Sequence, residues 1–501
     1  MAETQYGRCV VQSATLRGVR AEPVDVEVAV TRGMPAFHIV GMADAAIQEA
    51  RERIKAACNA CGFSLPASKI VVNLAPGSLR KSGSGFDLPI AVALLRATRQ
   101  IDPGMAQGYL LVGELSLEGR VRPVPGLLAY ALCAQKLGLG LIGSSYDEPL
   151  CPVEGVTHQC IQSLATLRTG DFQAAEPFAS ATVAPPPDFS EVAGHDVAKR
   201  ALQIAAAGEH GVLMMGPPGS GKTMLASRLP SILPPLSKEE QLETAVIHST
   251  AGQPLGPIFA GARPFRAPHH SISLAGLVGG GKPVRPGEVT LAHNGVLFLD
   301  ELAEFKPSVL QGIRQPMEAG CVSVTRADGN IVFPARFSLV AASNPCPCGF
   351  YGDDEMACRC TVPQVRTYQN RIGGPILDRI DMQLEVKRLP SVSVLETGRG
   401  TSSHTLREGV MVGREFASWR REAFPTDEAK GRTERLLQAC QLDDKSRAFL
   451  EAAGSSQHLS GRAIMRVLSV SRTIADLEQS QRVSAEHVGE ALSYRLPEER
   501  T

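Results

Sequence analysis

The stretch that decides the fold of the central part of this chain is VLMMGPPGSGKTMLASRL, residues 212–229. Four apolar residues precede a glycine-rich loop and a helical segment, which is the strand, loop and helix order that a phosphate-binding loop requires. The glycines let backbone N–H groups turn inward around phosphates at a helix N-terminus, where the helix dipole also favours negative charge. A chance Gly-Pro turn before a helix is the alternative. The predicted loop consists of Gly216, Pro217, Pro218, Gly219, Ser220, Gly221, Lys222 and Thr223.

A second segment, GVLFLDE at residues 295–301, supplies the carboxylates that such a loop needs. Its apolar residues predict a buried strand that ends at the phosphate edge of the sheet. We expect Lys222 to neutralise the β- and γ-phosphates, and Thr223 and Asp300 to hold Mg²⁺. Glu301 is then the base that polarises the attacking water. A DE pair alone is an ordinary strand end, but the two segments together predict an enzyme that binds ATP and Mg²⁺ and hydrolyses ATP.

The composition is that of a folded protein without a strong overall charge. Of 501 residues, 44% are hydrophobic and 20% are charged, and 51 basic residues balance 51 acidic ones. Any polyanionic partner must therefore be bound locally rather than through the net charge. The N-terminus lacks the basic and apolar segments of a secretory signal, and no apolar stretch approaches the ~18 residues of a membrane span. We expect a cytoplasmic protein with no membrane partner.

Changes of pattern along the chain predict an α/β protein with several domains. Residues 1–172 alternate short β-branched segments with helical ones, which indicates one α/β domain. Residues 173–188 are rich in Ala and Pro and predict an extended linker. Residues 189–390 repeat the strand and helix order of a parallel sheet, and residues 391–501 change to helical periodicity.

Individual elements can be placed from their patterns. VDVEVAV at 24–30 and KIVVNLA at 69–75 predict strands, and DAAIQEARERIKAAC at 44–58 predicts a helix. Residues 321–337, CVSVTRADGNIVFPARF, predict a β-hairpin with a DGN turn. SAEHVGEAL begins a helix at a Ser cap near the C-terminus.

Four cysteines lie close together, in CPC at 346–348 and CRC at 358–360. Because disulfides are rare in a reducing cytosol, free thiols or metal ligands are favoured. Four thiols in a short loop can surround one tetrahedral zinc ion, and buried thiols or a redox cluster are the alternatives. The candidate zinc ligands are Cys346, Cys348, Cys358 and Cys360.

Several long stretches resemble one known family. They are FHIVGMADAAIQEARERI (37–54), VNLAPGSLRKSGSGFDLPIA (72–91), RPFRAPHHSIS (263–273), RPGEVTLAHNGVLFLDEL (285–302), ASNPCPCG (342–349) and GPILDRIDM (374–382). Together they are similar to the YifB/ComM group of AAA+ ATPases, often labelled magnesium-chelatase-like, over nearly the whole chain. The resemblance implies a central AAA+ parallel sheet with a helix-2 insertion, a C-terminal helical lid and a Lon-protease-like N-terminal α/β domain.

The resemblance also implies three further residues of the ATP site. Asn344 matches the first sensor, which would reach the γ-phosphate or its water; an Asn that caps a turn is the alternative. Arg379 in LDRID matches an arginine finger for a neighbouring subunit's ATP, and an intrachain pair with Asp378 or Asp381 is the alternative. Arg462 in LSGRAI matches the second sensor, and a solvated helix arginine is the alternative. A finger that acts on a neighbour requires a ring, and the family implies a homo-hexamer.

Two segments are implied to contact DNA. The insertion, residues 263–288, resembles the helix-2 insertion of this clade, and hairpins such as the one at 321–337 face the pore in the family. Ordinary surface or subunit contacts are the alternative. The candidate DNA contacts are Arg263, Arg266, Lys282 and Arg326.

The protease-like domain is expected to be inactive. In the Lon family a Ser nucleophile and a Lys base form the catalytic pair, but alignment of residues 81–91 places Gly85 at the nucleophile position. Alignment of residues 121–132 places Leu128 where the lysine should be. Without a nucleophile and a base there is no acyl-enzyme route. Ser84 is adjacent to the nucleophile position, so Ser84→Ala is the variant that tests this expectation.

The leading hypothesis is a hexameric ATP-driven motor that encircles single-stranded or branched DNA and moves it. The resemblance to the ComM group implies this substrate, as a helicase or branch-migration factor in homologous recombination or natural transformation. A magnesium-chelatase-type motor that remodels a protein partner is the alternative. An ATP-dependent protease is a third class, which the missing catalytic pair opposes.

Overall fold

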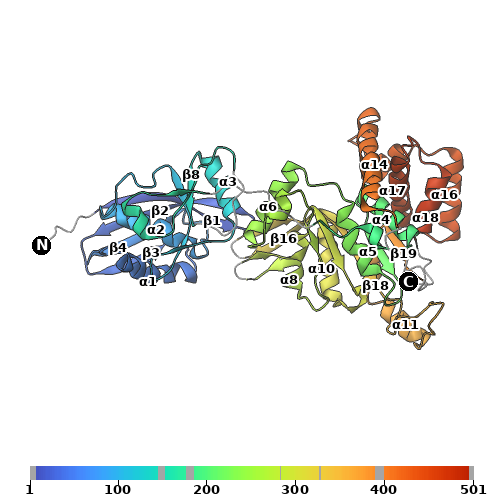
Figure 1. The fold of residues 1–501 in the computed structure, drawn as a ribbon, viewed down its shortest axis with the longest axis horizontal. Helices are drawn as coiled ribbons and strands as arrows, with labels where there is room; N and C mark the ends of the chain where they lie inside the picture. Colours follow the sequence, from blue (N-terminus) through green and yellow to red (C-terminus); the bar gives the residue numbers. More distant parts are fainter. Residues whose placement is uncertain are drawn as a thin grey trace.

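A computed structural model describes residues 7–144, 153–175, 185–281, 284–326, 329–389 and 400–495. The molecule is elongated, with an N-terminal α/β part at one end, a second α/β part in the middle and a group of helices at the other end (Figure 1). The predicted linker at 173–188 lies largely outside the described residues.

The N-terminal part is built on an eight-stranded sheet with the order β10-β9-β8-β5-β1-β2-β4-β3. Its strands are β1 (Arg8–Arg17), β2 (Arg20–Thr31), β3 (Ala36–Val40), β4 (Lys69–Ala75), β5 (Tyr109–Leu111), β8 (Gly140–Gly143), β9 (His158–Cys160) and β10 (Gln173–Ala174). The strands predicted at 24–30 and 69–75 are confirmed as parts of β2 and β4. Alternate residues of β2 are buried, from Val24 to Val30, as expected for a sheet that buries one face.

Three helices cover this sheet. They are α1 (Ala45–Ala60), α2 (Asp87–Ala97) and α3 (Leu127–Leu137), joined by the short helices η1 (Ser84–Phe86) and η2 (Leu164–Arg168) and the small hairpin β6 (Glu114–Leu115) and β7 (Val121–Arg122). Helix α1 confirms the prediction at 44–58, and the Asp44 side chain caps it by accepting from the Ile47 N–H. Helix α2 packs on β1 and β2 with almost every residue buried.

The central part contains a five-stranded sheet, β12-β15-β18-β11-β19, in which every pair is parallel. Its strands are β11 (Val212–Met215), β12 (Phe265–Arg266), β15 (Gly295–Leu299), β18 (Phe337–Ser343) and β19 (Met382–Glu385). Val212 and Met214 join one hydrophobic cluster, whereas Leu213 and Met215 join another. The sheet is therefore covered on both faces, as parallel sheets are.

Helices and short strands surround the central sheet. The helices are α4 (Asp196–Gly208), α5 (Lys222–Arg228), α6 (Lys238–Thr250), α7 (Gly256–Phe259), α8 (Leu274–Val278), α9 (Glu288–Leu291), α10 (Pro307–Ala319), α11 (Val362–Gln369) and α12 (Gly374–Leu377), with short helices η3 (Phe189–Glu191), η4 (Leu229–Ser231) and η5 (Leu302–Glu304). The insertion carries the small pair β13 (Gly279–Gly280) and β14 (Arg285–Pro286).

The hairpin predicted at 321–337 is confirmed as β16 (Cys321–Arg326) and β17 (Gly329–Pro334), and its two turn residues lie outside the described residues. It contacts the turn between β1 and β2, because a Cβ atom on Gly18 would lie 2.7 Å from Cγ2 of Ile331. Val19 of the same turn packs against the cluster that contains Val322 and Phe333. The N-terminal part therefore covers one side of the hairpin.

The C-terminal helices share one core with the central sheet. They are α14 (Ser403–Ala423), α15 (Arg432–Cys440), α16 (Asp444–Ser456), α17 (Gly461–Leu477) and α18 (Ala485–Ser493). Val467, Leu468 and Ile474 of α17 pack in the same cluster as residues of α4 and β11. The predicted Ser cap is confirmed, since the Ser484 hydroxyl accepts from the His487 N–H at the start of α18.

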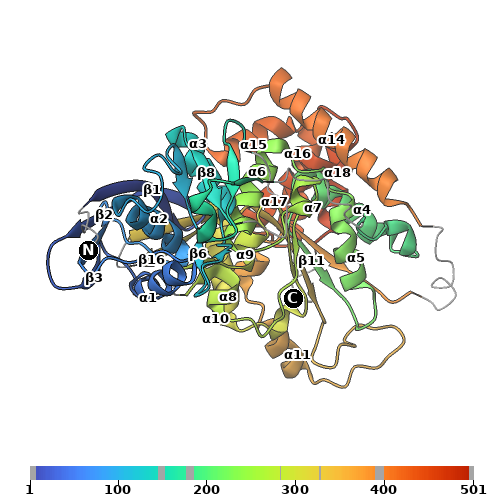
Figure 2. The same cartoon turned by 60° about the vertical axis from the view of Figure 1, so that its left-hand side comes forward.

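Helix α3 of the N-terminal part packs beside α6 of the central part (Figures 1 and 2). Leu128 is fully buried there in a cluster with Leu236, Ala245 and Ile258. The backbone N–H of Leu128 also donates to the Ser249 hydroxyl at 3.3 Å. Leu128 thus contributes to the interface between the two parts.

Candidate active site

The strand, loop and helix order predicted for residues 212–229 is confirmed, because the loop leads from β11 directly into α5. Gly219 and Gly221 have φ angles of 78° and 86°, a left-handed backbone that residues with a Cβ adopt only at a cost. The Lys222 ammonium donates to the carbonyl oxygens of Gly216 at 2.8 Å and Pro217 at 2.9 Å. The loop itself thus holds the lysine.

The environment of Lys222 disfavours its charge. Burial lowers the pKa of Lys222 to about 8; the nearby Asp300 carboxylate opposes the shift and Arg388 adds to it. A triphosphate that replaced the carbonyl partners would stabilise the charged ammonium. The site is therefore suited to an anionic ligand.

Thr223 and Asp300 lie next to each other at the edge of the sheet where β15 ends. The Thr223 hydroxyl donates to Oδ2 of Asp300 at 2.7 Å. A hydroxyl and a carboxylate oxygen are the hard ligands that Mg²⁺ prefers, and Mg²⁺ usually retains several waters and takes phosphate oxygens as further ligands. These two residues therefore fit the predicted magnesium site.

Glu301 follows Asp300 with a left-handed backbone, φ 53°. Its N–H donates to Oδ1 of Asp300 at 2.9 Å. Its carboxylate Oε2 lies 3.1 Å from Nδ1 of His270. The predicted base is thus next to the magnesium ligands but paired with a histidine from another segment.

These residues line a cleft of about 330 Å³ beside the phosphate loop. The walls are Thr223, Ser227, Phe265, Ala267, Pro268, His269, His270, Phe298, Asp300 and Glu301. The cleft therefore joins the end of β15, the start of α5 and the segment that follows β12.

Asn344 follows β18, the strand between β15 and β11 in the sheet. Its side-chain Oδ1 lies 3.4 Å from Nζ of Lys222. Because the carboxyl ends of parallel strands meet at one edge, Asn344 lies beside the phosphate loop. The structure thus brings together Lys222, Thr223, Asp300, Glu301 and Asn344.

Two further residues lie at the loop although the sequence analysis did not assign them to the nucleotide site. The Arg388 guanidinium donates to the Pro218 carbonyl at 3.0 and 3.2 Å. His195 lies beside Gly221, and burial lowers its pKa, which favours the neutral ring. Arg388 follows the last strand of the sheet and could have been found from that position, whereas nothing in the sequence alone indicated His195.

Arg379 and Arg462 are remote from the phosphate loop of the same chain. Asp381 N–H donates to the Gly211 carbonyl at 3.0 Å, so Arg379 lies at the edge where the parallel strands β11 and β19 begin. The phosphate loop follows the end of β11, a strand of four residues that spans roughly 13 Å. The two predicted arginines thus lie on the opposite edge of the sheet from Lys222.

Both arginines line one large groove, with a volume of about 1490 Å³, between this edge and the C-terminal helices. Arg379 forms an ion pair with Glu318 of α10, a partner that sequence reasoning did not name. Asp381 instead pairs with Arg466 and lies 3.6 Å from Nδ1 of His210. The groove is open to a ligand or to another molecule.

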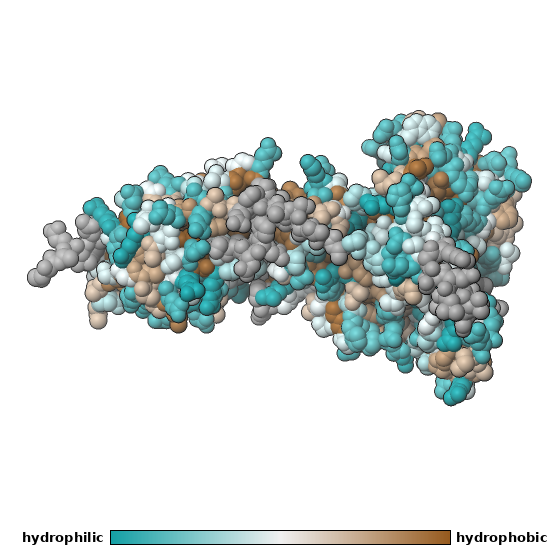
Figure 3. Space-filling model, viewed as in Figure 1, coloured by the Kyte–Doolittle hydropathy of each residue, from teal (hydrophilic) through white to brown (hydrophobic). Residues whose placement is uncertain are grey.

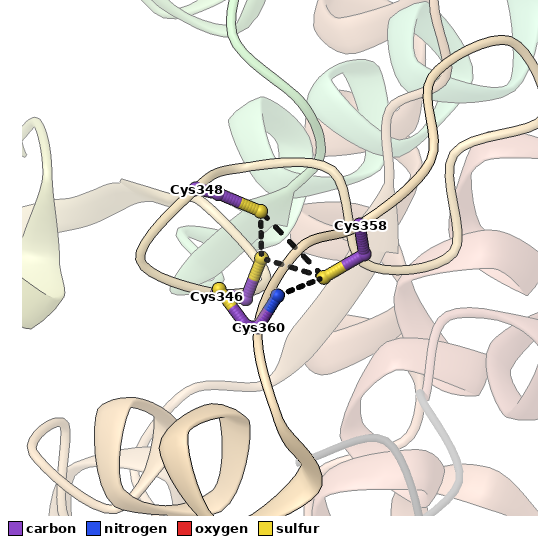
Figure 4. Close-up of side chains that lie close together, drawn as sticks. All are labelled: Cys346, Cys348, Cys358 and Cys360. Carbon is purple, nitrogen blue, oxygen red and sulfur yellow. Dashed lines mark hydrogen bonds between the residues drawn. The ribbon is translucent and has the colours of Figure 1, made fainter.

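The four predicted cysteines form one cluster (Figure 4). Their ligand atoms all lie within 4.8 Å of one another. Three sulfur–sulfur distances are 3.4 Å for Cys346–Cys348, 3.7 Å for Cys346–Cys358 and 3.6 Å for Cys348–Cys358. Sulfurs around one zinc at a Zn–S bond of about 2.3 Å would lie about 3.8 Å apart, so the cluster is consistent with a zinc site.

The thiols of the cluster are not equivalent: a backbone N–H donor lowers the pKa of Cys358 and of Cys360, but desolvation and the neighbouring sulfurs outweigh it and leave both raised. Backbone N–H donors from Arg359 and Phe350 lower the pKa of Cys348 to about 6, which favours the thiolate that binds metal. The Cys360 N–H donates to the Cys358 sulfur at 3.4 Å (Figure 4). Backbone donors thus already point at the sulfurs.

The cysteine loop, residues 346–360, contacts the phosphate loop directly. A Cβ atom on Gly349 would lie 2.5 Å from Cδ of Pro218. Phe350 lies against the Arg388 guanidinium, 5.2 Å from the ring centre, and Arg388 in turn donates to Pro218. The cysteine loop and Arg388 therefore support the same residue of the phosphate loop.

The candidate DNA contacts differ in their surroundings. Arg263 is largely buried and pairs with Glu240 at 3.1 Å. Arg266 forms two hydrogen bonds with Glu288, at 2.6 and 2.8 Å. Both guanidinium groups have acidic partners within the chain, and their contact with DNA stays a prediction. Lys282 and the side chain of Arg326 lie outside the described residues.

The positions that correspond to the protease catalytic residues lie among apolar side chains, and the neighbouring serine is already hydrogen-bonded. A Cβ atom on Gly85 would lie 3.1 Å from Val112 and 3.8 Å from Val124. Ser84 donates to the Glu114 carboxylate, and Leu128 is buried against α6. The Lon-like fold and the absence of peptidase activity both stay predictions.

The surface drawn in Figure 3 is mostly hydrophilic, with smaller hydrophobic areas between. Within the described ranges, none of the helices combines the length and the hydrophobicity needed to cross a membrane.

Comparisons with known proteins agree over nearly the whole length. Three family models match: "Magnesium chelatase, subunit ChlI" at 188–394, "Subunit ChlI of Mg-chelatase" at 26–142 and "Magnesium chelatase, subunit ChlI C-terminal" at 400–495. The YifB protein of Salmonella typhimurium is 41% identical over 97% of this chain and 96% of its own. The competence protein ComM of Haemophilus influenzae is 42% identical over 97% of each chain. A magnesium-chelatase 67 kDa subunit of Chlorobaculum parvum is 31% identical over 31% of this chain and 23% of its own.

Proposed function

Because this chain belongs to the YifB/ComM family of magnesium-chelatase-like ATPases, we propose that it is a ring-forming motor that uses ATP hydrolysis to move single-stranded or branched DNA. The matched ATPase domain implies ATP, Mg²⁺ and hydrolysis. The DNA substrate rests on the family resemblance and on a relative that is named a competence protein. The observation that carries the ring is the position of Arg379 and Arg462 on the edge opposite the phosphate loop.

The residues at the phosphate loop have distinct tasks in hydrolysis. Lys222 binds the β- and γ-phosphates, and Thr223 and Asp300 orient Mg²⁺. Glu301 accepts a proton from the water whose oxygen bonds to the γ-phosphorus, while the bond to the ADP oxygen breaks and ADP leaves with that electron pair. Asn344, 3.4 Å from Nζ of Lys222, is placed to contact the γ-phosphate or this water.

An arginine that neutralises the charge on the transferring phosphoryl group stabilises the transition state and so accelerates phosphoryl transfer. Arg379 and Arg462 are too far across the sheet to serve the ATP of their own chain. A neighbouring copy that placed its groove against this phosphate loop would supply both. Hydrolysis would then occur at the contact between subunits, in a closed ring of identical copies, as a hexamer provides.

Mixing two inactive variants tests this arrangement. Lys222→Ala cannot bind the phosphates of ATP but keeps both arginines. Arg379→Ala keeps an intact phosphate loop but lacks the arginine finger. In rings mixed at random from equal amounts, about a quarter of the contacts join an intact loop to an intact arginine, so about a quarter of the wild-type rate should return. The control mixes Arg379→Ala with the double variant that carries both Lys222→Ala and Arg379→Ala. Every subunit in that mixture lacks Arg379, so no contact joins an intact loop to an intact arginine. A mixture no more active than this control would contradict the proposal.

The DNA part is tested by the ATPase rate with and without single-stranded and forked DNA, with Glu301→Gln as the blank. Marked stimulation that weakens as salt rises supports a DNA motor, because phosphate contacts release counterions. Hydrolysis that is indifferent to DNA favours the second candidate, a chelatase-type motor that remodels a protein partner. The three matching magnesium-chelatase models are the observation behind that candidate.

A further inference from the structure

The Asp381 carboxylate joins several segments in a way that the mechanism above does not use. Asp381 lies two residues after Arg379, just before β19, and lines the groove that contains both predicted arginines. We infer that Asp381 is a positioning residue: it holds Arg379 and Arg462 as one unit that acts on the ATP of a neighbouring copy. This inference rests on the proposed ring.

On the side of Arg379, Asp381 fixes the backbone to the central sheet. The Gly211 N–H donates to Oδ2 of Asp381 at 3.0 Å, and the Asp381 N–H donates to the Gly211 carbonyl at 3.0 Å. Gly211 immediately precedes β11. The direct partner of the Arg379 guanidinium, Glu318, has a side chain that is 62% exposed, so that pair holds only the end of the arginine. The two reciprocal hydrogen bonds therefore anchor the chain two residues from Arg379.

On the side of Arg462, Asp381 fixes helix α17. Oδ1 of Asp381 accepts from the guanidinium of Arg466. Arg466 follows Arg462 by four residues, which places the two arginines on the same face of the helix, one turn apart. Both line the groove. The ion pair therefore holds the part of α17 that carries Arg462.

A buried histidine adds a second contact between α17 and the start of β11. Nε2 of His210 lies 2.8 Å from the Thr473 hydroxyl oxygen, and Nδ1 of the same ring lies 3.6 Å from Oδ2 of Asp381. Thr473 follows Arg466 by seven residues, two turns along the same helix face. Because α17 meets the start of β11 at two points, it cannot turn about its own axis without breaking one of them.

The contacts of Asp381 depend on its charge. Burial acts to raise the pKa of Asp381, but hydrogen bonds and the nearby positive charges outweigh it and hold the pKa below its ordinary value. Hydrogen bonds between an arginine and a carboxylate are also stronger than those between neutral groups. An asparagine at this position would therefore hold Arg466 more weakly.

Position matters because an arginine that stabilises a transferring phosphoryl group must meet it in a defined place. A displacement of about 1 Å can lower a rate by about a hundredfold. The phosphate loop of the same chain follows the other end of β11, so it keeps its own contacts when Asp381 is changed. Substitution of Asp381 should therefore lower kcat and leave nucleotide affinity unchanged.

The test variant is Asp381→Asn, which keeps the size of the side chain and removes its charge. The matched control is Glu490→Gln, which breaks the ion pair of Glu490 with Arg200, 3.0 Å apart, between α18 and α4. That pair also joins the C-terminal helices to the central part, but neither residue lines the groove. Asp381→Asn should lower kcat roughly tenfold to a hundredfold with wild-type affinity for a non-hydrolysable ATP analogue. Glu490→Gln should stay within about twofold of the wild-type kcat.

Mixtures show which half of the contact between copies is impaired. In equal amounts with Lys222→Ala, Asp381→Asn should recover about a quarter of the wild-type rate, because the Lys222→Ala subunits keep Asp381 and both arginines. With Arg379→Ala it should recover nothing above the separate rates, because both variants are impaired in the same half. A defect in the variant's own phosphate loop would give the reverse pattern.

A wild-type kcat for Asp381→Asn, or recovery with Arg379→Ala in place of Lys222→Ala, would overturn the inference. The ring would still stand if the mixture of Lys222→Ala with Arg379→Ala recovered activity. No recovery in that last mixture would refute the ring and this inference together. If Asp381→Asn does not fold, Arg466→Met, which breaks the same ion pair from the side of α17, is measured in the same mixtures and decides by the same outcomes.

Discussion

The contact between the cysteine loop and the phosphate loop gives the sharpest prediction. Gly349 has a φ of 86°, and a Cβ atom there would lie 2.5 Å from Cδ and 2.7 Å from Cγ of Pro218. Gly352 is in the same loop with a φ of 77°, and a Cβ atom on it would meet nothing within 4 Å. The substitutions Gly349→Ala and Gly352→Ala therefore share the backbone penalty and differ in the contact with Pro218.

The expected magnitude follows from this difference. Each alanine costs about 1 kcal/mol for the left-handed backbone. Gly349→Ala adds an overpacking energy of about 1–3 kcal/mol against a rigid proline ring. Each 1 kcal/mol of this energy that displaces the phosphate loop weakens ATP binding about fivefold. We therefore expect Gly349→Ala to bind ATP at least about fivefold more weakly, and Gly352→Ala to bind like wild type.

The assay is a titration of each variant with a fluorescent, non-hydrolysable ATP analogue, with thermal unfolding measured in parallel. Equal affinities for Gly349→Ala and the wild type would refute the reasoning, because the clash would then be absorbed by the cysteine loop alone. An equal loss in both alanine variants would refute it too, since the effect would come from loop stability and not from Pro218.

Four other predictions concern the remaining features. Glu301→Gln should bind nucleotide normally and hydrolyse it about 10²–10⁴-fold more slowly in single-turnover assays, since the general base is lost. Bound phosphates favour the charged form of Lys222, whose pKa is about 8 in the free site; affinity measured by calorimetry should therefore fall about tenfold from pH 7 to pH 9. Lys222→Arg should lose this dependence, because an arginine stays charged throughout that range. Metal analysis should find about one zinc per chain, and Cys348→Ser, which removes one of four ligands, should lose most of it. Leu128→Ala should lower the free energy of unfolding in urea by about 2–5 kcal/mol, whereas Leu137→Ala, on an exposed position of the same helix, should change it by less than about 0.5 kcal/mol.

Local patterns predicted the central sheet and the residues along its carboxyl edge. Lys222 and Asp300 each follow an apolar strand, and parallel strands bring such positions together whatever the details of packing. Asn344 also follows a strand of this sheet, but its role was predicted from the family resemblance. Strand ends thus carry most of the information about this site.

The sequence could not show contacts that depend on how separate segments pack. The pairing of Arg379 with Glu318 joins two elements distant in the sequence, and no spacing rule relates them. Arg263 and Arg266 were predicted as DNA contacts from their charge and their place in the insertion. Their internal partners, Glu240 and Glu288, could be identified only once the helices were placed.

The position of Leu128 has a consequence for the history of the N-terminal part. On the predicted alignment this position would hold the lysine of a peptidase, whereas the Leu128 side chain is buried between the N-terminal and central parts. A lysine placed there would bring an unpaired ammonium into an apolar contact, which is strongly unfavourable. A lysine at position 128 would thus disrupt the contact between the N-terminal and central parts. A serine at position 85 alone would give no peptidase activity, because the catalytic base would still be missing. On the predicted alignment, each single substitution toward proteolysis is therefore expected to be neutral or harmful.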